Sequence, residues 1–435
     1  MNGLEAVEIR LSELEFTRRI DAEYYKKEYL HYEEEIMKSE FKRLEEVSNF
    51  LIGPFGSAFK TENYEENSGY RYVRGQDVKP FRLQDSDNKS MPQEDFERLK
   101  KYSLKKNDVL VSVVGTLGNA CIVQQEDLPG IFSCKSTVLR SKEINPVYLL
   151  TYLNAKQGRN LLLRKERGAI QKGLNLDDLK SLIINIPTPA FQLHIENVFY
   201  KAQGKLKESK SLYAQAEQLL LDELGLHNWK PTEANTEVKS FKNSFLESGR
   251  LDAEYYQPKY DEIENKIKEY KGGYSDLGKI LKEITTGEYS SEYSSKAKGL
   301  RFYIRNTNIL QGEIIEDEAY YVHPSNFSKF AKEGQILTAR VGAIGNFGTI
   351  SKKFEGAIYS DNVLAIELID NLNPEVYTCY FNSTLNRELL KRITGGSVQP
   401  LITQTSIKEI LIPLFPKLTQ EKALQLIQQS FQLKK

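Results

Sequence analysis

The sequence predicts an α+β protein that contains two tandem copies of one mixed α/β domain. A heptapeptide, Arg-Ile-Asp-Ala-Glu-Tyr-Tyr at residues 19–25, returns with one conservative change at residues 250–256. Shorter matches follow in the same order, among them Tyr72-Val73-Arg74 with Tyr303-Ile304-Arg305. Apolar runs with strand-like and helix-like spacing alternate along each half. A repeat as long as half of the chain indicates two whole domains rather than a solenoid.

The order of expected elements is the same in both halves. It is a buried strand, a Gly-x-x-Gly turn, a short strand, a segment of helical spacing and a final strand. The first set falls at 109–114, 115–118, 120–123, 146–163 and 182–186, and the second at 335–341, 342–345, 348–350, 374–393 and 410–412. This common order is typical of two copies of one fold separated by small loop insertions.

A long helix is expected between the two copies. Pro189 stands near its start, Gly225 stands where a helix stop belongs, and apolar residues recur every three or four positions between them. At ~1.5 Å per residue, about 35 residues form a rod of roughly 50 Å. The segment from Pro416 begins the same helix again and is shorter. We expect a spacer here; a long helix that caps one domain is the alternative.

Composition bounds the class of protein. With 435 residues, 28% of them charged and 40% hydrophobic, the chain is typical of a soluble globular protein. It shows no apolar run long enough to span a bilayer and no signal peptide, and its three cysteines lack metal-binding spacing, so we expect a cytoplasmic protein with free thiols. Its four histidines form no ligand cluster, and no Walker loop, dinucleotide fingerprint, nucleophile elbow or zinc-protease motif is present. We therefore expect neither a metal site nor catalysis in this chain.

Two stretches of the first half carry side chains suited to DNA. Residues 53–60 form a glycine-rich loop that ends in a lysine, where backbone N–H groups can approach a phosphate. Arg74 and Gln76 follow a short strand, and such side chains make paired contacts to base edges. An ordinary turn, and a salt bridge from Arg74 to Asp77, are the alternatives. The candidate DNA contacts of this half are Gly53, Phe55, Gly56, Ser57, Lys60, Arg74, Gln76, Lys135, Arg167, Gln171 and Lys172.

A basic stretch extends this candidate surface. Residues 135–172 hold nine basic residues against two acidic ones, although the whole chain has 60 of each sign. A local basic stripe on a neutral protein is typical of a DNA reader that works with partners, and a solvated charged surface is the alternative. Weaker copies of the motifs place the candidate DNA contacts of the second half at Thr286, Tyr289, Ser290, Arg305, Asn306, Arg340 and Gln399.

Four motifs, together with the duplicated plan, are similar to those of a known family. They are Ile52-Gly53-Pro54-Phe55-Gly56-Ser57, Tyr72-Val73-Arg74-x-x-Asp77-Val78, Asp108-Val109-Leu110-Val111-Ser112-x-x-Gly115-x-x-Gly118, and Gly168-x-x-Gln171-x-x-Leu174 leading to Ile186-Pro187-x-Pro189 and Gln192. This combination resembles the specificity (S) subunit of type I restriction–modification systems. The resemblance covers nearly the whole chain, with weaker copies of the motifs in the second half.

The resemblance implies two target-recognition domains joined by long antiparallel, coiled-coil-like helices. Each domain would read one half of a split, asymmetric DNA site, and the helices would set the gap. The subunit would be non-catalytic and hold no cofactor, since two methyltransferase subunits bring S-adenosylmethionine and restriction/translocase subunits use ATP and Mg²⁺. The implied segments are an N-terminal conserved segment at 1–39, recognition domain 1 at 40–188, the spacer helix at 189–229, a connecting conserved segment at 230–271, recognition domain 2 at 272–413 and a short C-terminal helix at 414–435.

The heptapeptide and the long helix are expected to form the contacts with partner subunits or between helices. Acids and tyrosines are poor tools for gripping phosphate, so each heptapeptide is expected to hold the start of its domain against the helical arm, or to face a methyltransferase subunit. The candidate residues are Tyr24, Tyr25, Tyr255, Tyr256, Ile195, Val198, Ala202, Leu212, Ala216 and Leu219.

The second half departs from the pattern at one loop. Residues 285–290 show no clear Gly-Pro-Phe-Gly copy, as expected if the two half-sites differ. The short C-terminal helix leaves open whether the long helix also pairs with 1–40 or with a second copy of the chain. A stand-alone DNA-binding regulator, and a phage-defence scaffold subunit that uses the same domains to hold proteins, are the alternative functions.

Overall fold

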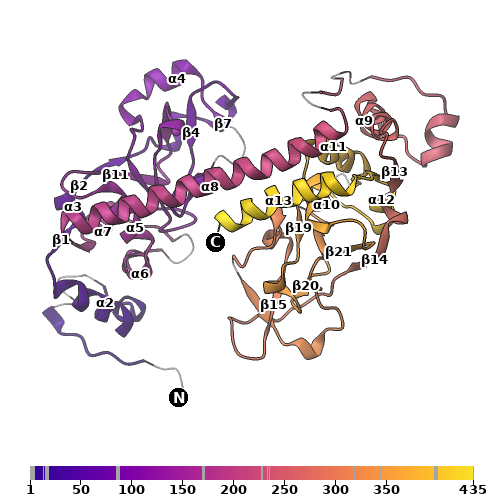
Figure 1. Ribbon diagram of the computed structural model, residues 1–435. Helices are drawn as coiled ribbons and strands as arrows, with labels where there is room; N and C mark the ends of the chain where they lie inside the picture. Colours follow the sequence, from indigo (N-terminus) through magenta and orange to yellow (C-terminus); the bar gives the residue numbers. More distant parts are fainter. Residues whose placement is uncertain are drawn as a thin grey trace. The chain divides into compact units, whose positions relative to one another are not determined.

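The chain folds into two compact units, at 1–203 and 204–435, each with its own strands and helices (Figure 1). The computed structural model describes residues 5–12, 14, 19–84, 89–168, 172–226, 229–232, 234, 236–317, 319–342, 344–395 and 400–434. Helix α8 (Pro189–Glu223) begins in the first unit and continues into the second. The α+β class expected from the sequence is confirmed.

The first unit alternates short strands with short helices. Its elements, with η for 3₁₀ turns, are η1 (Ala22–Tyr25), α2 (Lys27–Met37), β1 (Phe41–Arg43), α3 (Leu44–Val47), β2 (Ser48–Ile52), η2 (Gly56–Ala58), β3 (Glu65–Glu66), β4 (Arg71–Val73), η4 (Gly75–Asp77), β5 (Val78–Lys79), β6 (Arg82–Leu83), β7 (Lys89–Ser90), α4 (Gln93–Arg98), β8 (Val109–Ser112), β9 (Ala120–Ile122), β10 (Gly130–Phe132), β11 (Ser136–Ser141), α5 (Pro146–Asn154), α6 (Lys156–Arg164), α7 (Leu176–Lys180) and β12 (Ile183–Asn185).

The second unit repeats this order after α8. Its elements are η8 (Ala253–Tyr256), α9 (Pro258–Lys268), β13 (Tyr274–Asp276), β14 (Leu281–Thr286), β15 (Arg301–Ile304), η10 (Asn306–Asn308), β16 (Gly312–Glu313), β17 (Tyr320–Val322), β18 (Ile336–Ala339), β19 (Phe347–Thr349), β20 (Ile358–Tyr359), β21 (Val363–Leu368), α10 (Pro374–Phe381), α11 (Thr384–Ile393), α12 (Gln404–Lys408), β22 (Leu411–Pro413) and α13 (Lys417–Leu433).

Both units are built on the same strand order. The main sheet runs β2-β11-β8-β9 in the first unit and β14-β21-β18-β19-β16 in the second. In the smaller sheet, β10 pairs in parallel with β4, and β20 pairs in parallel with β15. An antiparallel pair, β1 with β12 and β13 with β22, ties the start of each copy to its end. The duplication read from the sequence is therefore a duplication of topology.

Each main sheet is buried on both faces. Successive side chains of a strand point to opposite faces, so Val109 and Val111 of β8 join the cluster that contains Val147 of α5. Leu110, between them, joins Phe132 in a cluster on the other side. Strand β18 divides in the same way in the second unit. Helix α5 packs beside one sheet and α10 beside the other (Figure 1).

The segment of helical spacing after each main sheet folds as two helices. Ala155, between α5 and α6, is extended at φ −66° and ψ 150°. Ser383 precedes α11 with φ −63° and ψ 155°, and its hydroxyl accepts a hydrogen bond from the N–H of Asn386. A Cβ on Gly158 of α6 would lie 2.0 Å from the carbonyl oxygen of Tyr152. The helical spacing of apolar residues continues across the break, so periodicity alone does not reveal it.

Candidate nucleic-acid interface

In both units an arginine follows a strand of the smaller sheet and begins a 3₁₀ turn. The N–H of Arg74 donates to Oδ2 of Asp77 at 2.8 Å, and the N–H of Arg305 donates to Oδ1 of Asn308 at 2.9 Å. Asp77 is 3% exposed and Asn308 is 1% exposed. Because a buried side chain caps each turn, the two arginines occupy equivalent places in the two copies.

The two arginine side chains are held by different chemistry. Arg74 makes the salt bridge that was the alternative to a base contact, with Nη2 3.0 Å from Oδ1 of Asp77. The guanidinium of Arg305 stacks on the ring of Tyr320 at 4.0 Å from the centroid. A guanidinium has five N–H donors, so neither arrangement by itself excludes a base edge. Contacts of Arg74 and Arg305 with base edges stay predictions. The two side chains that would make them are oriented differently.

A glycine follows the first strand of the main sheet in both units. A Cβ on Gly53 would lie 2.6 Å from the carbonyl oxygens of Phe132 and Ser133. A Cβ on Gly287 would lie 2.1 Å from the carbonyl oxygen of Tyr359. Both glycines therefore allow the same close crossing of backbones, one over the end of β10 and one over the end of β20. Gly287 is thus the counterpart of Gly53, which the sequence comparison of these loops did not find.

Beyond Gly53 the loop of the first unit turns toward solvent. Phe55 is 75% exposed, and Gly56, Ser57 and Lys60 are also exposed. The N–H of Ala58 donates to the carbonyl of Phe55 at 2.8 Å, which closes the turn. An exposed aromatic ring and an exposed lysine in one loop offer a stacking surface and a phosphate contact. The glycine-rich motif predicted a loop whose backbone N–H groups approach a phosphate, with an ordinary turn as the alternative, and its contact with DNA stays a prediction.

The corresponding loop of the second unit presents tyrosines. Tyr289 is 71% exposed, and the rings of Tyr293 and Tyr320 lie 5.0 Å apart at the surface. Two predicted contacts turn inward instead: Thr286 Oγ1 is 2.8 Å from Nε2 of Gln404, and Ser290, 9% exposed, donates to the carbonyl of Glu292 at 2.9 Å. The sequence reading missed Tyr293 and Tyr320; the signal was the density of tyrosines between 289 and 321.

The remaining candidates fall into three groups. Gln76 and Lys135 are exposed, and Lys135 lies beside the 74–77 turn, 3.1 Å from a Cβ built on Gly75. Asn306 and Arg340 are partly buried. Gln171 and Gln399 lie outside the described residues.

The basic stretch 135–172 is not a row of uncompensated charge, which corrects the sequence reading. Folding brings acids of the same unit to its cations. The pairs are Arg140–Asp108 at 2.9 Å, Lys156–Glu28 at 3.3 Å, Arg164–Glu33 at 2.6 Å, Arg167–Asp178 at 2.6 Å, and Lys172–Glu166. Lys165 is 8% exposed, and burial lowers its pKa. A charge count along the sequence cannot include acids that only folding brings near.

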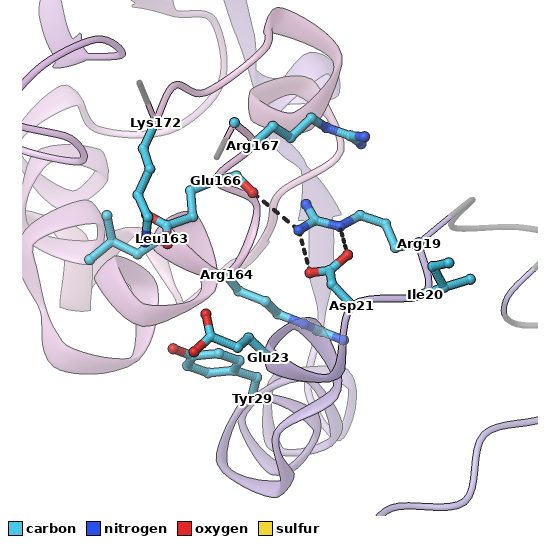
Figure 2. A pocket seen from close by; sticks show the side chains of 11 residues that line it. Arg19, Ile20, Asp21, Glu23, Tyr29, Leu163, Arg164, Glu166, Arg167 and Lys172 are labelled. Carbon is cyan, nitrogen blue, oxygen red and sulfur yellow. Dashed lines mark hydrogen bonds and ion pairs between the residues drawn. The ribbon is translucent and has the colours of Figure 1, made fainter. Parts of the chain in front are cut away.

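The repeated heptapeptide folds on itself in the first unit (Figure 2). Arg19 pairs with Asp21 through two hydrogen bonds, of 2.8 and 2.6 Å. The hydroxyl of Tyr25 donates to the carbonyl of Arg19 at 3.1 Å, and the rings of Tyr24 and Tyr25 meet edge to face at 5.0 Å. The arginine, the aspartate and both tyrosines are therefore required by contacts within the motif.

The last residue of α6 holds this motif in place. The guanidinium of Arg164 lies 4.0 Å from the ring centroid of Tyr24 and donates to the Tyr24 carbonyl. Its Nη1 is 2.6 Å from a carboxylate oxygen of Glu33 on α2. The Arg164 side chain, 3% exposed, thus links the heptapeptide, the helix after it and the recognition fold.

The second unit repeats this clamp. Arg250 pairs with Asp252, Tyr256 donates to the carbonyl of Arg250 at 2.9 Å, and the Tyr255 and Tyr256 rings again meet edge to face at 5.0 Å. Arg392 of α11 takes the place of Arg164: it stacks on Tyr255 at 4.8 Å and pairs with Asp261 at 2.9 Å and Glu264 at 2.6 Å. Each heptapeptide is thus clamped to a short helix of its own unit. The sequence did not reveal this contact; the expectation that the heptapeptide holds the start of its domain against the long helical arm, or faces a methyltransferase subunit, stays a prediction.

Helices α8 and α13 pack closely inside the second unit. Ser209 and Ser430 are both 0% exposed; their hydroxyls lie 3.1 Å apart, and Ser430 donates to the Ser209 carbonyl at 2.8 Å. Near the other end, Thr419 donates to Glu223 at 3.0 Å. Because position 209 faces 430 while 223 faces 419, the two helices run antiparallel, as the sequence reading expected.

The candidate interface residues on α8 divide between buried and exposed positions. Ala216 is 0% exposed, and Leu219 packs against the core of the second unit. Ile195 packs against the core of the first unit, whereas Val198 is 53% exposed. Of the others, Leu212 is partly buried and Ala202 is exposed. The sequence reading missed Tyr213 and Leu220, which are 8% and 1% exposed and complete the buried stripe with Ser209 and Ala216.

One carboxylate near the Arg305 turn has a strongly shifted pKa. Glu316 accepts a hydrogen bond from Lys296 at 2.8 Å and one from the Tyr321 hydroxyl, and it lies 2.9 Å from Lys353. The Lys296 contact is the largest cause that lowers its pKa to about 2. The next residue, Asp317, accepts a hydrogen bond from Asn308 at 2.7 Å through its carbonyl. Glu316 therefore stays ionised at neutral pH and braces the loop behind the turn.

Among the residues that the structure describes, no group of three or more His, Cys, Asp or Glu side chains could hold a metal ion. Within the same part of the chain, none of the helices combines the length and the apolar character needed to cross a membrane.

The fold and its paired turns define a protein made of two copies of one α+β domain, each with an exposed loop and a capped arginine turn. The chain belongs to the family of the type I restriction modification DNA specificity domain, whose model matches residues 37–199 and 274–434. One match falls in each half of the chain, and the family resemblance drawn from the four motifs is confirmed.

The individual proteins that are similar to this chain share little sequence identity with it. The chain is 27% identical over 125 residues to the type I restriction enzyme EcoBI specificity subunit of Escherichia coli, which is 28% of this chain and 26% of that protein. The chain thus matches about a quarter of the length of that curated relative. The chain is also similar to the crystal structure of the type I restriction-modification S subunit from M. genitalium, at 16% identity and a TM-score of 0.41, over 91% of this chain and 90% of that one. It is similar to the crystal structure of the HsdS subunit from Thermoanaerobacter tengcongensis, at 15% identity and a TM-score of 0.30, over 90% of this chain and 89% of that one.

Proposed function

We propose that this chain is the DNA sequence-specificity subunit of a type I restriction–modification complex. The observation that carries the proposal is that the specificity-domain model matches the chain twice, once in each half. Each unit then binds one half of a split, asymmetric DNA site. The two halves differ in sequence because the equivalent loops carry different side chains, Phe55 in one unit and Tyr289 in the other.

The arginine turns and the exposed loops form the reading surface in this proposal. Arg74 and Arg305 sit at equivalent places, yet one is paired with a carboxylate and the other is stacked on a tyrosine. Arginine reads guanine through two acceptors on the base edge, so a difference in its orientation changes which base it meets. Lys60 and Lys135, both exposed, supply phosphate contacts that position the first unit without reading sequence.

Helices α8 and α13 set the gap between the half-sites in this proposal. Partners supply the chemistry: two methyltransferase subunits bring S-adenosylmethionine, and restriction/translocase subunits use ATP and Mg²⁺. The chain itself is non-catalytic and acts in the cytoplasm. Its balance of 60 basic and 60 acidic residues supports a reader that shares DNA binding with its partners.

Methylation mapping tests the proposal directly. The chain is co-expressed with a type I methyltransferase subunit, and methylated adenines are mapped across a genome. The expected result is one split motif with two specific halves and an unspecific gap of fixed length. Methylation without sequence preference, or no complex between the two proteins, would overturn the proposal.

Substitutions of the two arginines test which half of the DNA motif each unit reads. Arg74→Ala should relax specificity in one half of the motif and Arg305→Ala in the other, because each side chain lies in a separate unit. A lost base contact of this kind costs about 1–3 kcal/mol of discrimination. The two variants control for each other. Loss of specificity in both halves from either single change would show that these turns do not read one half-site each.

Shortening α8 tests the spacer. Removing about seven residues, close to two turns, shortens a helix by about 10 Å, the rise of about three base pairs of DNA. The mapped gap should shorten while the bases of both halves stay the same. A change in the bases, with the gap unaltered, would show that α8 is not the ruler.

A further inference from the structure

An aromatic ring stands at the same place in the exposed loop of each unit. Phe55 comes two residues after Gly53 and is 75% exposed, and Tyr289 comes two residues after Gly287 and is 71% exposed. The two glycines are counterparts, because each allows the same close crossing of backbones. The residues on either side of the two rings differ between the loops. An exposed aromatic ring is therefore what the two loops have in common.

Each ring lies at the same edge of the smaller sheet as the arginine turn of its unit. Gly53 crosses the end of β10, and β10 pairs in parallel with β4, the strand that leads into Arg74. Gly287 crosses the end of β20, and β20 pairs in parallel with β15, the strand that leads into Arg305. Parallel strands end at the same edge of a sheet, so the loop and the turn are neighbours in both units.

Hydrogen bonds hold the backbone that carries each ring. In the first unit the carbonyl of Phe55 accepts a hydrogen bond from the N–H of Ala58 at 2.8 Å. In the second unit the N–H of Glu288 donates to the carbonyl of Tyr359 at 3.0 Å, and the hydroxyl of Tyr303 donates to the carbonyl of Glu288 at 2.7 Å. A held backbone lowers the entropy cost of a contact made by the ring above it. Both rings are therefore preorganised for stacking.

Base reading does not explain why a ring stands at this place in both units. In the proposed function the two half-sites differ, so side chains that read bases are expected to differ as well. Phosphate contacts are made by cations and hydrogen-bond donors, not by rings. The two half-sites share one step, the methylation of an adenine. An enzyme that modifies a base within a duplex takes that base out of the stack, which costs stacking and pairing energy. Stacking of an aromatic ring on a neighbouring base offsets part of this cost.

We propose that Phe55 and Tyr289 stack on the DNA at the point where the target adenine of each half-site leaves the duplex. The proposal rests on the proposed function and adds a step to it, since the recognition subunit then stabilises the opened DNA while the methyltransferase subunit holds the displaced adenine. Phe55 serves one half-site and Tyr289 the other. The Tyr289 hydroxyl and the residues beside both rings are left to differ with the bases of each half-site.

Fluorescence of 2-aminopurine measures the displacement, because this adenine analogue brightens when it leaves the stack. The full chain with its methyltransferase subunits and S-adenosylhomocysteine is bound to a duplex of the mapped site, with 2-aminopurine at one target adenine. Phe55→Ala should lower the rise in fluorescence about 5-fold or more at one half-site and leave the other unchanged. Tyr289→Ala should do the reverse. Phe55→Tyr and Tyr289→Phe should keep the rise, because they keep a ring.

Methyl transfer provides a second readout. In Phe55→Ala the kcat at one adenine should fall about 10-fold or more, while KM for DNA changes less. A mismatched base opposite that adenine lowers the cost of displacement and should restore the rate, which it would not do for a misfolded unit or a lost base contact. Phe41→Ala and Tyr274→Ala are matched controls. They remove exposed rings that begin β1 and β13, and both adenines should be methylated as in the wild type.

The outcomes separate this step from the proposed function. Unchanged fluorescence and rate in both alanine variants would overturn the proposal and leave the proposed function standing. A relaxed motif with a normal rise in fluorescence would also overturn it, because the rings would then read base edges. Loss of the methyltransferase subunit from the variants would do the same, because the rings would then bind protein. A wild-type complex that methylates no split site would overturn the proposed function and this step together.

Discussion

Replacing Arg164 by alanine should release the first heptapeptide from α6 and leave the second one in place. The Arg164 side chain is 3% exposed, lies 2.6 Å from Glu33 and stacks on Tyr24 at 4.0 Å. Removing one partner of a buried ion pair costs about 3–5 kcal/mol. Glu33 is 28% exposed and regains water, so we expect the lower end, about 3 kcal/mol. A loss of this size raises the population of the undocked segment by about 100-fold.

Hydrogen exchange measures this release segment by segment. In Arg164→Ala the amides of residues 19–37 should exchange faster, while those of 250–268 keep their rate and serve as the internal reference. Arg392→Ala should produce the mirror result. Arg164→Lys should fall between, because lysine keeps the charge but not the planar fork that stacks and pairs. Unchanged exchange at 19–37 in Arg164→Ala, or an equal increase in both segments, would refute the reasoning.

Three further predictions follow from single contacts. Gly53→Ala should destabilise the first unit by about 1–3 kcal/mol in chemical denaturation, because the new Cβ would lie 2.6 Å from backbone oxygens. Gly56→Ala, whose Cβ would have nothing within 4 Å, should change the free energy of unfolding little. Equal effects of the two changes would contradict the close crossing of backbones at Gly53. Ser430→Ala should cost about 1 kcal/mol, because it removes a buried donor to the Ser209 carbonyl; no cost would mean that the helix pair does not depend on this contact. Glu316 has a folded pKa of about 2, below the ordinary 4.5, so its stabilisation is complete above about pH 5 and is lost as the pH falls toward 2. Glu316→Gln should therefore lower the free energy of unfolding at pH 7 and match the wild type near pH 2, and a pH-independent difference would contradict the assignment.

Much of the fold was predictable because it depends on local pattern. The apolar runs at 109–114 and 335–341 became β8 and β18, and Gly225, at φ +70°, ends α8 where the sequence placed the stop. The capped turns at Arg74 and Arg305 also follow from sequence, since the cap lies three residues from the arginine it holds. Local signals of this kind predict structure without knowledge of the rest of the chain.

The errors share one physical cause, which is dependence on distant residues. The basic stretch was misread because its acids come from α2, from α7 and from positions such as Asp108. Gly287 was not matched to Gly53 because the requirement for glycine comes from backbones near residues 132 and 359. The inward turn of Thr286, and the surface cluster of Tyr293 and Tyr320, likewise depend on neighbours that only folding supplies.

The sequence by itself determined that this protein is a duplicated α+β chain, where its long helix begins and ends, and which family it belongs to. These properties rest on order, spacing and short motifs, all of which are local. Only the tertiary structure decided which charges are neutralised, how the two equivalent arginines are held, and that each heptapeptide is clamped to a short helix of its own unit. The clamp depends on groups more than a hundred residues apart, such as Arg164 and Tyr24, whose interaction begins only when folding brings them within a few ångströms.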